Sequence, residues 1–159
     1  MKVELKIWRY DAVAGKRALE EYEVDAPEEA TLLDVLDIVK DRHDGTLAYR
    51  KSCRMMICGS CGMRMDGAAV LACKVRMYDV AQAGHVPVIS AMGNLPIVKD
   101  LVVDMEGFFA KFRSVQPFLQ NEGIVPERER RQSAADRAKF DDTTKCIPVS
   151  YTHLTLPTN

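Results

Sequence analysis

No apolar run in this 159-residue sequence approaches the roughly 18 residues that a membrane-spanning helix needs. The N-terminal stretch MKVELKIWRYD interleaves charged with apolar side chains, so it lacks the continuous apolar segment of a signal peptide. The formal net charge is only −1, and no overall basic field points to nucleic acid. These absences predict a cytosolic chain, or one that docks to a membrane only through partner proteins.

The five cysteines are unevenly spaced and odd in number, which does not suit a secreted disulfide scaffold. Cys53, Cys58 and Cys61 lie within nine positions, Cys73 follows closely, and Cys146 stands far away. In a reducing compartment, such thiols serve metal binding or redox chemistry more often than structural bridges. The cysteines are therefore the candidate functional residues.

The first part of the chain has the pattern of a small mixed sheet with one helix. Alternation over 1–10 and around 21–24 predicts two strands joined as a hairpin. Thr31 and Asp34 have nearly the spacing of a capping box, and an apolar stripe follows at Leu32, Val35, Leu36 and Val39. An Asp66-Gly67 turn predicts a second hairpin, and 86–89 suggests one more strand. Together these elements predict an α+β fold.

From about residue 95 the pattern becomes helical. We expect Asp100 to cap a helix that ends before Pro117. Its broad apolar face would contain Leu101, Val102, Met105, Phe108, Phe109 and Phe112. The charged run at 127–131 predicts a solvated helix face, and 133–140 predicts another short helix.

The cysteine spacing C-x4-C-x2-C-x11-C is typical of ligands to an iron–sulfur cluster, with three thiolates from one tight loop. Gly59 and Gly62 flank the ligands and would let backbone N–H groups approach the sulfurs. The second strand of the predicted hairpin would bring Cys73 back to the other three cysteines as the fourth ligand. The sequence therefore predicts one [2Fe–2S] cluster on Cys53, Cys58, Cys61 and Cys73.

Three other interpretations compete with a cluster. A structural zinc site would need a second closely spaced pair, which is missing. A thioredoxin-like Cys58-Gly59-Ser60-Cys61 leaves two cysteines unexplained, and inert core thiols do not explain four cysteines interleaved with glycines. A Rieske centre needs two nearby histidines, and the placement of His43, His85 and His153 does not supply them.

The stretches LAYRKSCRMMICGSCGMRMDGAAVLAC (47–73) and LPIVKDLVVDMEGFFAKFRSVQPFL (95–119) resemble the iron–sulfur subunit of the succinate dehydrogenase/fumarate reductase family. The resemblance extends over residues 1–147. It implies a β-grasp ferredoxin-like domain at 1–95 and the start of an incomplete α-helical ferredoxin domain at 96–147. It matches Cys53, Cys58, Cys61 and Cys73 to the family's [2Fe–2S] ligands.

The function that the resemblance implies is electron transfer within an oxidoreductase, in which this chain has no substrate site of its own. The partners would be a FAD-bearing flavoprotein, where succinate and fumarate interconvert, and a membrane anchor with quinone. The chain would then lie peripherally, on the cytoplasmic side of the inner membrane. A free-standing soluble [2Fe–2S] ferredoxin is the alternative, although such shuttles are usually strongly acidic.

The sequence departs from the family near its end. Cys146 matches the opening of a second cysteine run, which in the complete protein would help to bind [4Fe–4S] and [3Fe–4S] clusters. The chain continues instead as PVSYTHLTLPTN, and we interpret 148–159 as a non-native tail. Beside the first cluster, Arg50, Lys51 and Arg54 form either a solvated rim or a surface that tunes the cluster and docks the flavoprotein. Met55, Met56, Met63 and Met65 are expected to pack around the cluster.

Overall fold

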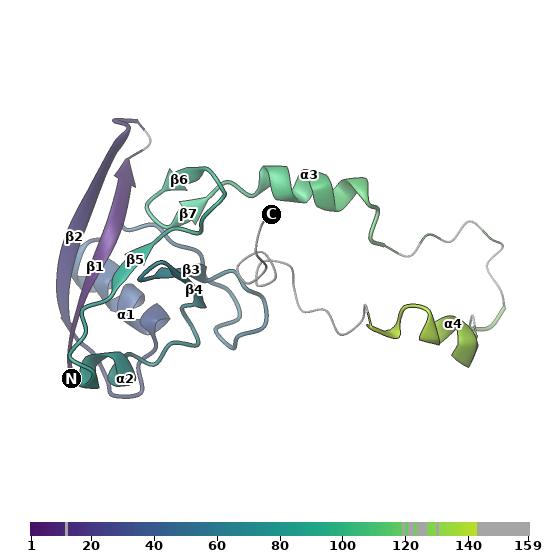
Figure 1. The fold of residues 1–159 in the computed structure, drawn as a ribbon, viewed down its shortest axis with the longest axis horizontal. Coiled ribbons are helices and arrows are strands. Elements are labelled where there is room, and N and C mark those ends of the chain that lie inside the picture. Colours follow the sequence, from purple (N-terminus) through teal and green to yellow (C-terminus); the bar gives the residue numbers. More distant parts are fainter. Residues whose placement is uncertain (12, 119, 121–122, 124–126, 130, 143–159) are drawn as a thin grey trace. The chain divides into compact units, whose positions relative to one another are not determined.

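The computed structural model describes residues 1–11, 13–118, 120, 123, 127–129 and 131–142. The chain divides into two units, Met1–Asp104 and the described part of Met105–Ile147. The first unit contains β1 (Lys2–Asp11), β2 (Lys16–Asp25), α1 (Leu32–Ile38), the short π-helical segment η1 (Val39–His43), β3 (Gly62–Met65), β4 (Ala68–Leu71), α2 (Met77–Gln82), β5 (Val88–Ser90), β6 (Ile97–Lys99) and β7 (Val102–Val103). The second unit contains α3 (Glu106–Ser114) and α4 (Ala134–Ala138). The predicted α+β class is confirmed (Figure 1).

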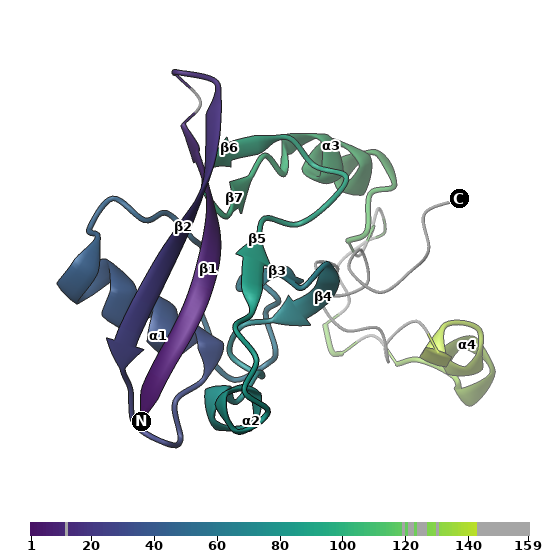
Figure 2. The same ribbon diagram turned by 60° about the vertical axis from the view of Figure 1, so that its left-hand side comes forward.

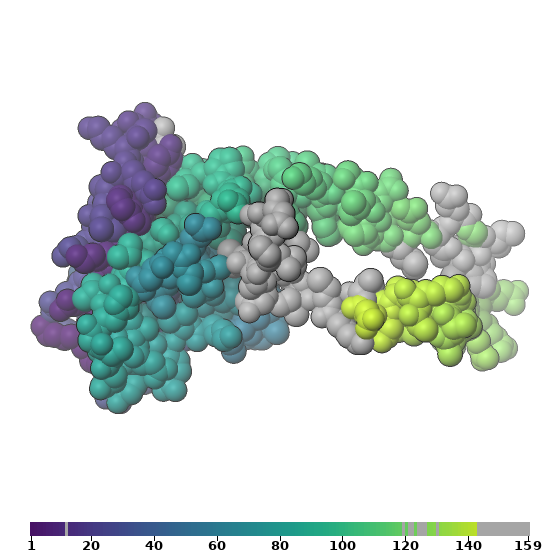
Figure 3. Space-filling model, viewed as in Figure 1, coloured from purple at the N-terminus to yellow at the C-terminus, as the bar shows by residue number. Residues whose placement is uncertain are grey.

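A five-stranded sheet in the order β2-β1-β5-β3-β4 forms the first unit, and Figure 2 shows its strands side by side. Strand β1 pairs antiparallel with β2 and parallel with β5. Its alternation is confirmed, because Val3, Leu5 and Ile7 are buried while Lys2 and Glu4 are exposed. The tip of the β1–β2 hairpin extends past the rest of this unit (Figure 3).

Helix α1 packs its apolar stripe into the same core as the sheet. The predicted capping box is present, because Thr31 N–H donates to Asp34 Oδ2 over 2.9 Å and Asp34 N–H donates to Thr31 Oγ1 over 3.3 Å. After α1 the helix continues as the wider π-helical segment η1, where Asp44 N–H donates to the Val39 carbonyl over 2.8 Å. The irregular segment from Asp44 to Cys61 then crosses from the helix to the second hairpin.

The β3–β4 hairpin turns at Asp66-Gly67, as predicted. Both residues have positive φ, 52° and 82°, which is the conformation of the two central residues of a type I′ turn. Asp66 also holds the start of β5, because Val88 N–H donates to its Oδ1 over 2.9 Å and His85 Nε2 lies 2.8 Å from its Oδ2. The turn thus fixes both β4 and β5 relative to β3.

The expected helix from Asp100 to Phe112 is wrong in its first half. Residues 97–103 form the β6–β7 pair, and α3 begins only at Glu106. Asp100 has φ 47° and a buried carboxylate that binds Arg9, so it is a turn residue and no N-cap. Leu101 is buried in the core of the first unit.

The other helix predictions after residue 113 had mixed outcomes. Residues 127–129 of the charged run are exposed but not helical, so the predicted helix face is wrong there. The short helix near 133–140 is confirmed as α4, with Ser133 as its N-cap. The predicted tail at 148–159 and Cys146 lie outside the described residues.

Candidate metal centre

The β3–β4 hairpin brings two of the four candidate cysteines together. Cys61 directly precedes β3 and Cys73 comes two residues after β4. The register pairs Gly62 with Leu71, and Ala72 N–H donates to the Cys61 carbonyl over 3.1 Å. Both thiols are buried, and neither is in a disulfide.

Cys53 and Cys58 lie in the loop that precedes this hairpin, and both are half-buried thiols outside any disulfide. The loop coils tightly, with left-handed backbone at Arg54 (φ 59°), Met56 (φ 63°) and Gly59 (φ 72°). Gly59 therefore has the positive φ that glycine permits. Gly62 begins β3 with no positive φ, and its N–H donates to the Gly59 carbonyl over 3.0 Å.

Backbone N–H groups of the coiled loop point at the cysteine sulfurs. Met55 N–H and Cys58 N–H donate to Cys53 Sγ over 3.4 and 3.3 Å. Ser60 N–H donates to Cys58 Sγ over 3.5 Å. Such donors stabilise anionic sulfur and tune iron–sulfur clusters, so this donor set fits a thiolate-held cluster.

The thiols of Cys58 and Cys61 differ in acidity. Hydrogen bonding from the Ser60 side chain, together with backbone hydrogen bonding at Cys53, lowers the pKa of Cys58 to about 6. Burial raises the pKa of Cys61 to about 11. The surroundings of Cys58 thus favour its thiolate, whereas those of Cys61 favour the thiol, whose proton a metal must displace on binding.

No group of three or more His, Cys, Asp or Glu side chains within the described ranges could hold a single metal ion. A [2Fe–2S] cluster takes its four thiolates at two irons, so its ligands need not meet at one point.

The four methionines near the candidate cysteines differ in how exposed they are. Met63 is buried and Met65 is partly buried, both in the hydrophobic core of the first unit. Met55 and Met56 are 64% and 53% exposed, and their packing around the cluster stays a prediction.

The cationic residues of the loop are mostly paired. Lys51 Nζ donates to Asp37 Oδ1 over 2.7 Å, and Arg54 binds Asp37 and Asp34. Arg50 is exposed and makes no ion pair within the part of the chain that the structure describes. The sequence pattern did not single out Asp37, although an acid within the apolar stretch of α1 was the available signal.

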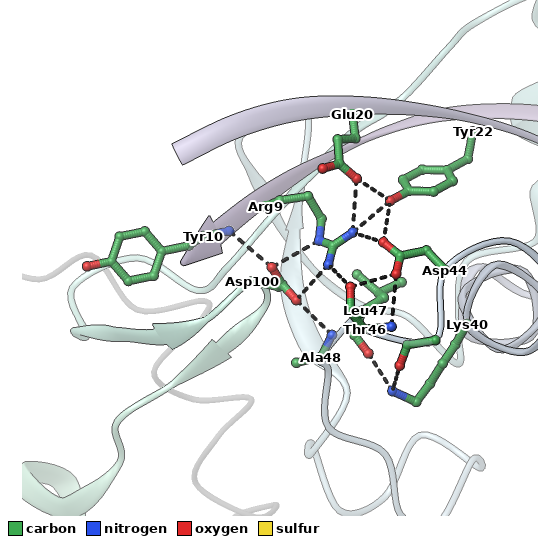
Figure 4. A network of polar contacts seen from close by, with 11 residues as sticks. Arg9, Tyr10, Glu20, Tyr22, Lys40, Asp44, Thr46, Leu47, Ala48 and Asp100 are labelled. Carbon is green, nitrogen blue, oxygen red and sulfur yellow. Dashed lines mark hydrogen bonds and ion pairs between the residues drawn. The ribbon is translucent and has the colours of Figure 1, made fainter. Parts of the chain in front are cut away.

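A second cluster of polar residues, also missed, surrounds Arg9 (Figure 4). The Arg9 guanidinium binds Asp100, Glu20 and Asp44, and donates to the hydroxyl oxygens of Tyr22 and Thr46. Burial acts to lower the pKa of Arg9, but hydrogen bonds to Asp100, Asp44 and Tyr22 outweigh it and raise that pKa. This network joins β1 to the segment that enters the cysteine loop.

A family model described as a 2Fe-2S iron-sulfur cluster binding domain matches residues 4–110. The chain belongs to this family. Its cofactor is accordingly a [2Fe–2S] cluster, as the cysteine spacing predicted.

Named relatives confirm the resemblance to succinate dehydrogenase iron–sulfur subunits. The chain is 38% identical over 143 residues to the succinate dehydrogenase (ubiquinone) iron-sulfur subunit 1, mitochondrial, of Oryza sativa subsp. japonica, covering 88% of this chain and 50% of that protein. It is 41% identical over 143 residues to the succinate dehydrogenase iron-sulfur subunit of Paracoccus denitrificans, covering 89% and 54%. The chain thus spans about half the length of these relatives.

Solved structures share the fold. A chain of the Mycobacterium smegmatis Sdh1 complex in the apo form matches with a TM-score of 0.80 at 24% identity, covering 97% of this chain and 63% of that chain. A hypothetical protein from Helicobacter pylori matches with a TM-score of 0.52 at 20% identity, covering 75% and 22%. The first match agrees with the predicted β-grasp ferredoxin-like fold. No helix among the described residues is both long and apolar enough to span a bilayer.

Proposed function

We propose that Cys53, Cys58, Cys61 and Cys73 hold the [2Fe–2S] cluster of this family. The observation that carries the assignment is the hairpin that places Cys61 beside Cys73, next to a loop whose N–H groups point at Cys53 and Cys58. When bound, the cluster supplies one-electron redox chemistry. The protein's part is to hold four thiolates, to donate hydrogen bonds to sulfur and to keep two of the ligands away from water.

Electron transfer as a subunit of a succinate dehydrogenase/fumarate reductase is the function that these features support. The names of the relatives support it. The cluster would relay electrons between a FAD flavoprotein, where succinate and fumarate interconvert, and quinone at a membrane anchor. The chain would lie peripherally on the cytoplasmic side of the inner membrane, bound through these partners.

The domain organisation belongs to the same proposal. Residues 1–95 would form the [2Fe–2S] domain, although the compact first unit continues through β6 and β7 to Asp104. Residues 96–147 would begin the helical ferredoxin domain, with Cys146 as a [4Fe–4S] ligand in a longer protein. Residues 148–159 would be a non-native tail.

Reconstitution of the chain with iron and sulfide tests the ligand assignment. We expect two irons and two acid-labile sulfides per chain, and an EPR signal at low temperature after reduction. Cys73→Ser should abolish the stable cluster, whereas Cys146→Ser, the matched control, should retain it. Stoichiometric zinc without labile sulfide, or an unchanged EPR spectrum in Cys73→Ser, would overturn the assignment.

Association tests the role as a subunit. Co-expressed with a succinate dehydrogenase flavoprotein, the chain should co-purify with it and accept electrons from succinate. A chain that remains separate and exchanges electrons only with soluble reductases would instead be a free-standing ferredoxin.

A further inference from the structure

Asp37 on α1 receives three donors from the segment that carries Cys53. Its carboxylate accepts hydrogen bonds from the Tyr49 hydroxyl, from Lys51 Nζ over 2.7 Å and from the Arg54 guanidinium. The side chain of Asp37 is only 16% exposed. Burial acts to raise its pKa, but hydrogen bonds from Lys51 and Tyr49 outweigh it and lower that pKa. Asp37 is therefore a charged, well-partnered acceptor beside the loop.

The segment that Asp37 holds has no regular secondary structure. Its beginning is fixed elsewhere, because Lys40 Nζ donates to the Leu47 carbonyl over 2.6 Å and Ala48 N–H donates to Asp100 Oδ2 over 2.9 Å. Beyond Ala48, the side-chain hydrogen bonds and ion pairs that join it to α1 go to Asp37, with one further 3.5 Å contact from Arg54 Nη1 to Asp34 Oδ1. Tyr49 also packs against the hydrophobic core. The polar anchoring of the segment around Cys53 is thus concentrated at Asp37.

The contacts of Asp37 lie on both sides of Cys53. Lys51 precedes the cysteine by two positions, and Arg54 follows it directly. Arg54 has φ 59°, a left-handed conformation that is costly for a residue with a side chain. That conformation sets the direction of the next N–H, from Met55, which donates to Cys53 Sγ over 3.4 Å. Holding the Arg54 side chain therefore helps to hold a donor on the sulfur.

We propose that Asp37 is the positioning residue of the cluster loop. Its hydrogen bonds to residues on both sides of Cys53 fix the position of that cysteine. Its negative charge compensates the positive charges of Lys51 and Arg54 beside the cluster. The inference rests on the ligand set proposed above. It adds an outer partner that touches none of the ligands.

The charge of Asp37 should affect the midpoint potential of the cluster, which anchoring of the loop alone would not do. Reduction adds an electron to a cluster, and cations near the cluster favour the reduced state while anions disfavour it. Replacing Asp37 by Asn leaves two cations uncompensated near Cys53. The midpoint potential should therefore rise, and the cluster should be lost more easily.

The test compares Asp37→Asn with Asp41→Asn in the full chain reconstituted with iron and sulfide. Asp41 lies one helical turn further on, in η1, and is exposed. Its carboxylate acts on Tyr49 only through its charge, and its side chain makes no hydrogen bond or ion pair within the described ranges. The test has two readouts. The midpoint potential comes from an EPR-monitored redox titration, and the rate of iron loss comes from transfer of iron to a chelator. Asp37→Asn should raise the potential and speed iron loss roughly fivefold, the size expected for losing partly exposed ion pairs. Asp41→Asn should change both much less, and Asp37→Glu should restore the potential.

A double background shows whether Asp37 acts through its partners. In Lys51→Met/Arg54→Met, a further Asp37→Asn change should speed iron loss much less than it does in wild type, although removal of the anion should still raise the potential. If Asp37→Asn assembles no cluster, Tyr49→Phe, which removes one donor, should still speed iron loss. Wild-type potential and iron loss in Asp37→Asn, an equal shift in Asp41→Asn, or an undiminished acceleration of iron loss in the double background would each refute the proposal.

Failure of this inference can be told apart from failure of the ligand assignment. A Cys53→Ser variant with an unchanged spectrum refutes the assignment. If Cys53→Ser loses the cluster while Asp37→Asn keeps the wild-type potential and rate of iron loss, only the role of Asp37 is refuted.

Discussion

Arg9 and Asp100 are 91 positions apart, yet Arg9 Nε donates to Asp100 Oδ1 over 2.9 Å. The two side chains are 11% and 2% exposed. Asp100 also accepts from the backbone N–H groups of Tyr10 and Ala48 over 3.1 and 2.9 Å. One ion pair therefore joins β1, the turn between β6 and β7, and the start of the cysteine loop (Figure 4).

Arg9→Met should strongly destabilise the first unit. It leaves the buried Asp100 carboxylate without its cation, which typically costs about 3–5 kcal/mol. Urea unfolding followed by the fluorescence of Trp8, the single tryptophan, measures the change. Lys2→Met is the matched control, because its ion pair with Glu23 is exposed, and its transition should barely move. Equal transitions for the two variants would contradict a stabilising role of the network.

Stability should fall on acidification partly through Asp44. Hydrogen bonds from Thr46 and Arg9 hold the pKa of this carboxyl well below its usual range. A lowered folded-state pKa adds stability above the unfolded value of about 4, and this stability is lost as the pH falls below it. The Trp8 transition of Asp44→Asn should therefore depend less on pH below about 5 than that of wild type. Hydrogen bonds with Lys139 and Ser133 also lower the pKa of Asp136, but this acid lies in α4, outside the first unit that Trp8 reports on. Asp136→Asn should therefore leave the pH dependence of the Trp8 transition unchanged.

Gly59→Ala should impair cluster assembly. Gly59 has φ 72°, and an alanine in that region is strained by about 1–2 kcal/mol. The rate at which the visible absorbance of the cluster appears on reconstitution should fall. Gly45→Ala is the control, because Gly45 has no positive φ and its added Cβ would meet only the Lys40 carbonyl at 3.8 Å. Equal assembly rates would mean that the loop does not need the left-handed conformation.

Local patterns predicted those parts of the fold that neighbouring residues determine. The capping box of Thr31 and Asp34, the Asp66-Gly67 turn and the alternation of β1 all depend on residues close in sequence. The turn at Asp100 depends on Arg9, and a distant partner of this kind leaves no periodic signal. The same limit explains why the cysteines were evident candidates while Asp37 was not. The ligands share a spacing, whereas Asp37 is recognised only by what it contacts.

Arg50→Glu should slow electron entry from a flavoprotein. Lys51 and Arg54 are engaged with Asp37, so reversing their charge would also disturb the loop. Arg50 is exposed, and exposed charges affect association more than stability. Stopped-flow reduction of the cluster at low and high ionic strength should show a slower rate for Arg50→Glu, and salt should diminish the difference. Lys16→Glu, at the start of β2, is the control, and equal rates for both variants would remove Arg50 from the docking surface.

The amide hydrogens of α3 should exchange much faster than those of β1. Helix α3 has nine residues, none of them buried, and Phe109 and Phe112 are 45% and 41% exposed. Isolated helices shorter than about 12 residues are marginal in water, so α3 has little to protect it. Phe112→Ser should consequently leave the Trp8 transition unchanged. Met63→Ala, at a site 1% exposed in the first unit, should cost about 2–5 kcal/mol. Hydrogen exchange measured by mass spectrometry on the reconstituted chain makes the comparison directly. Protection of α3 equal to that of β1 would show that its aromatic face is covered, and would contradict the exposure on which this prediction rests.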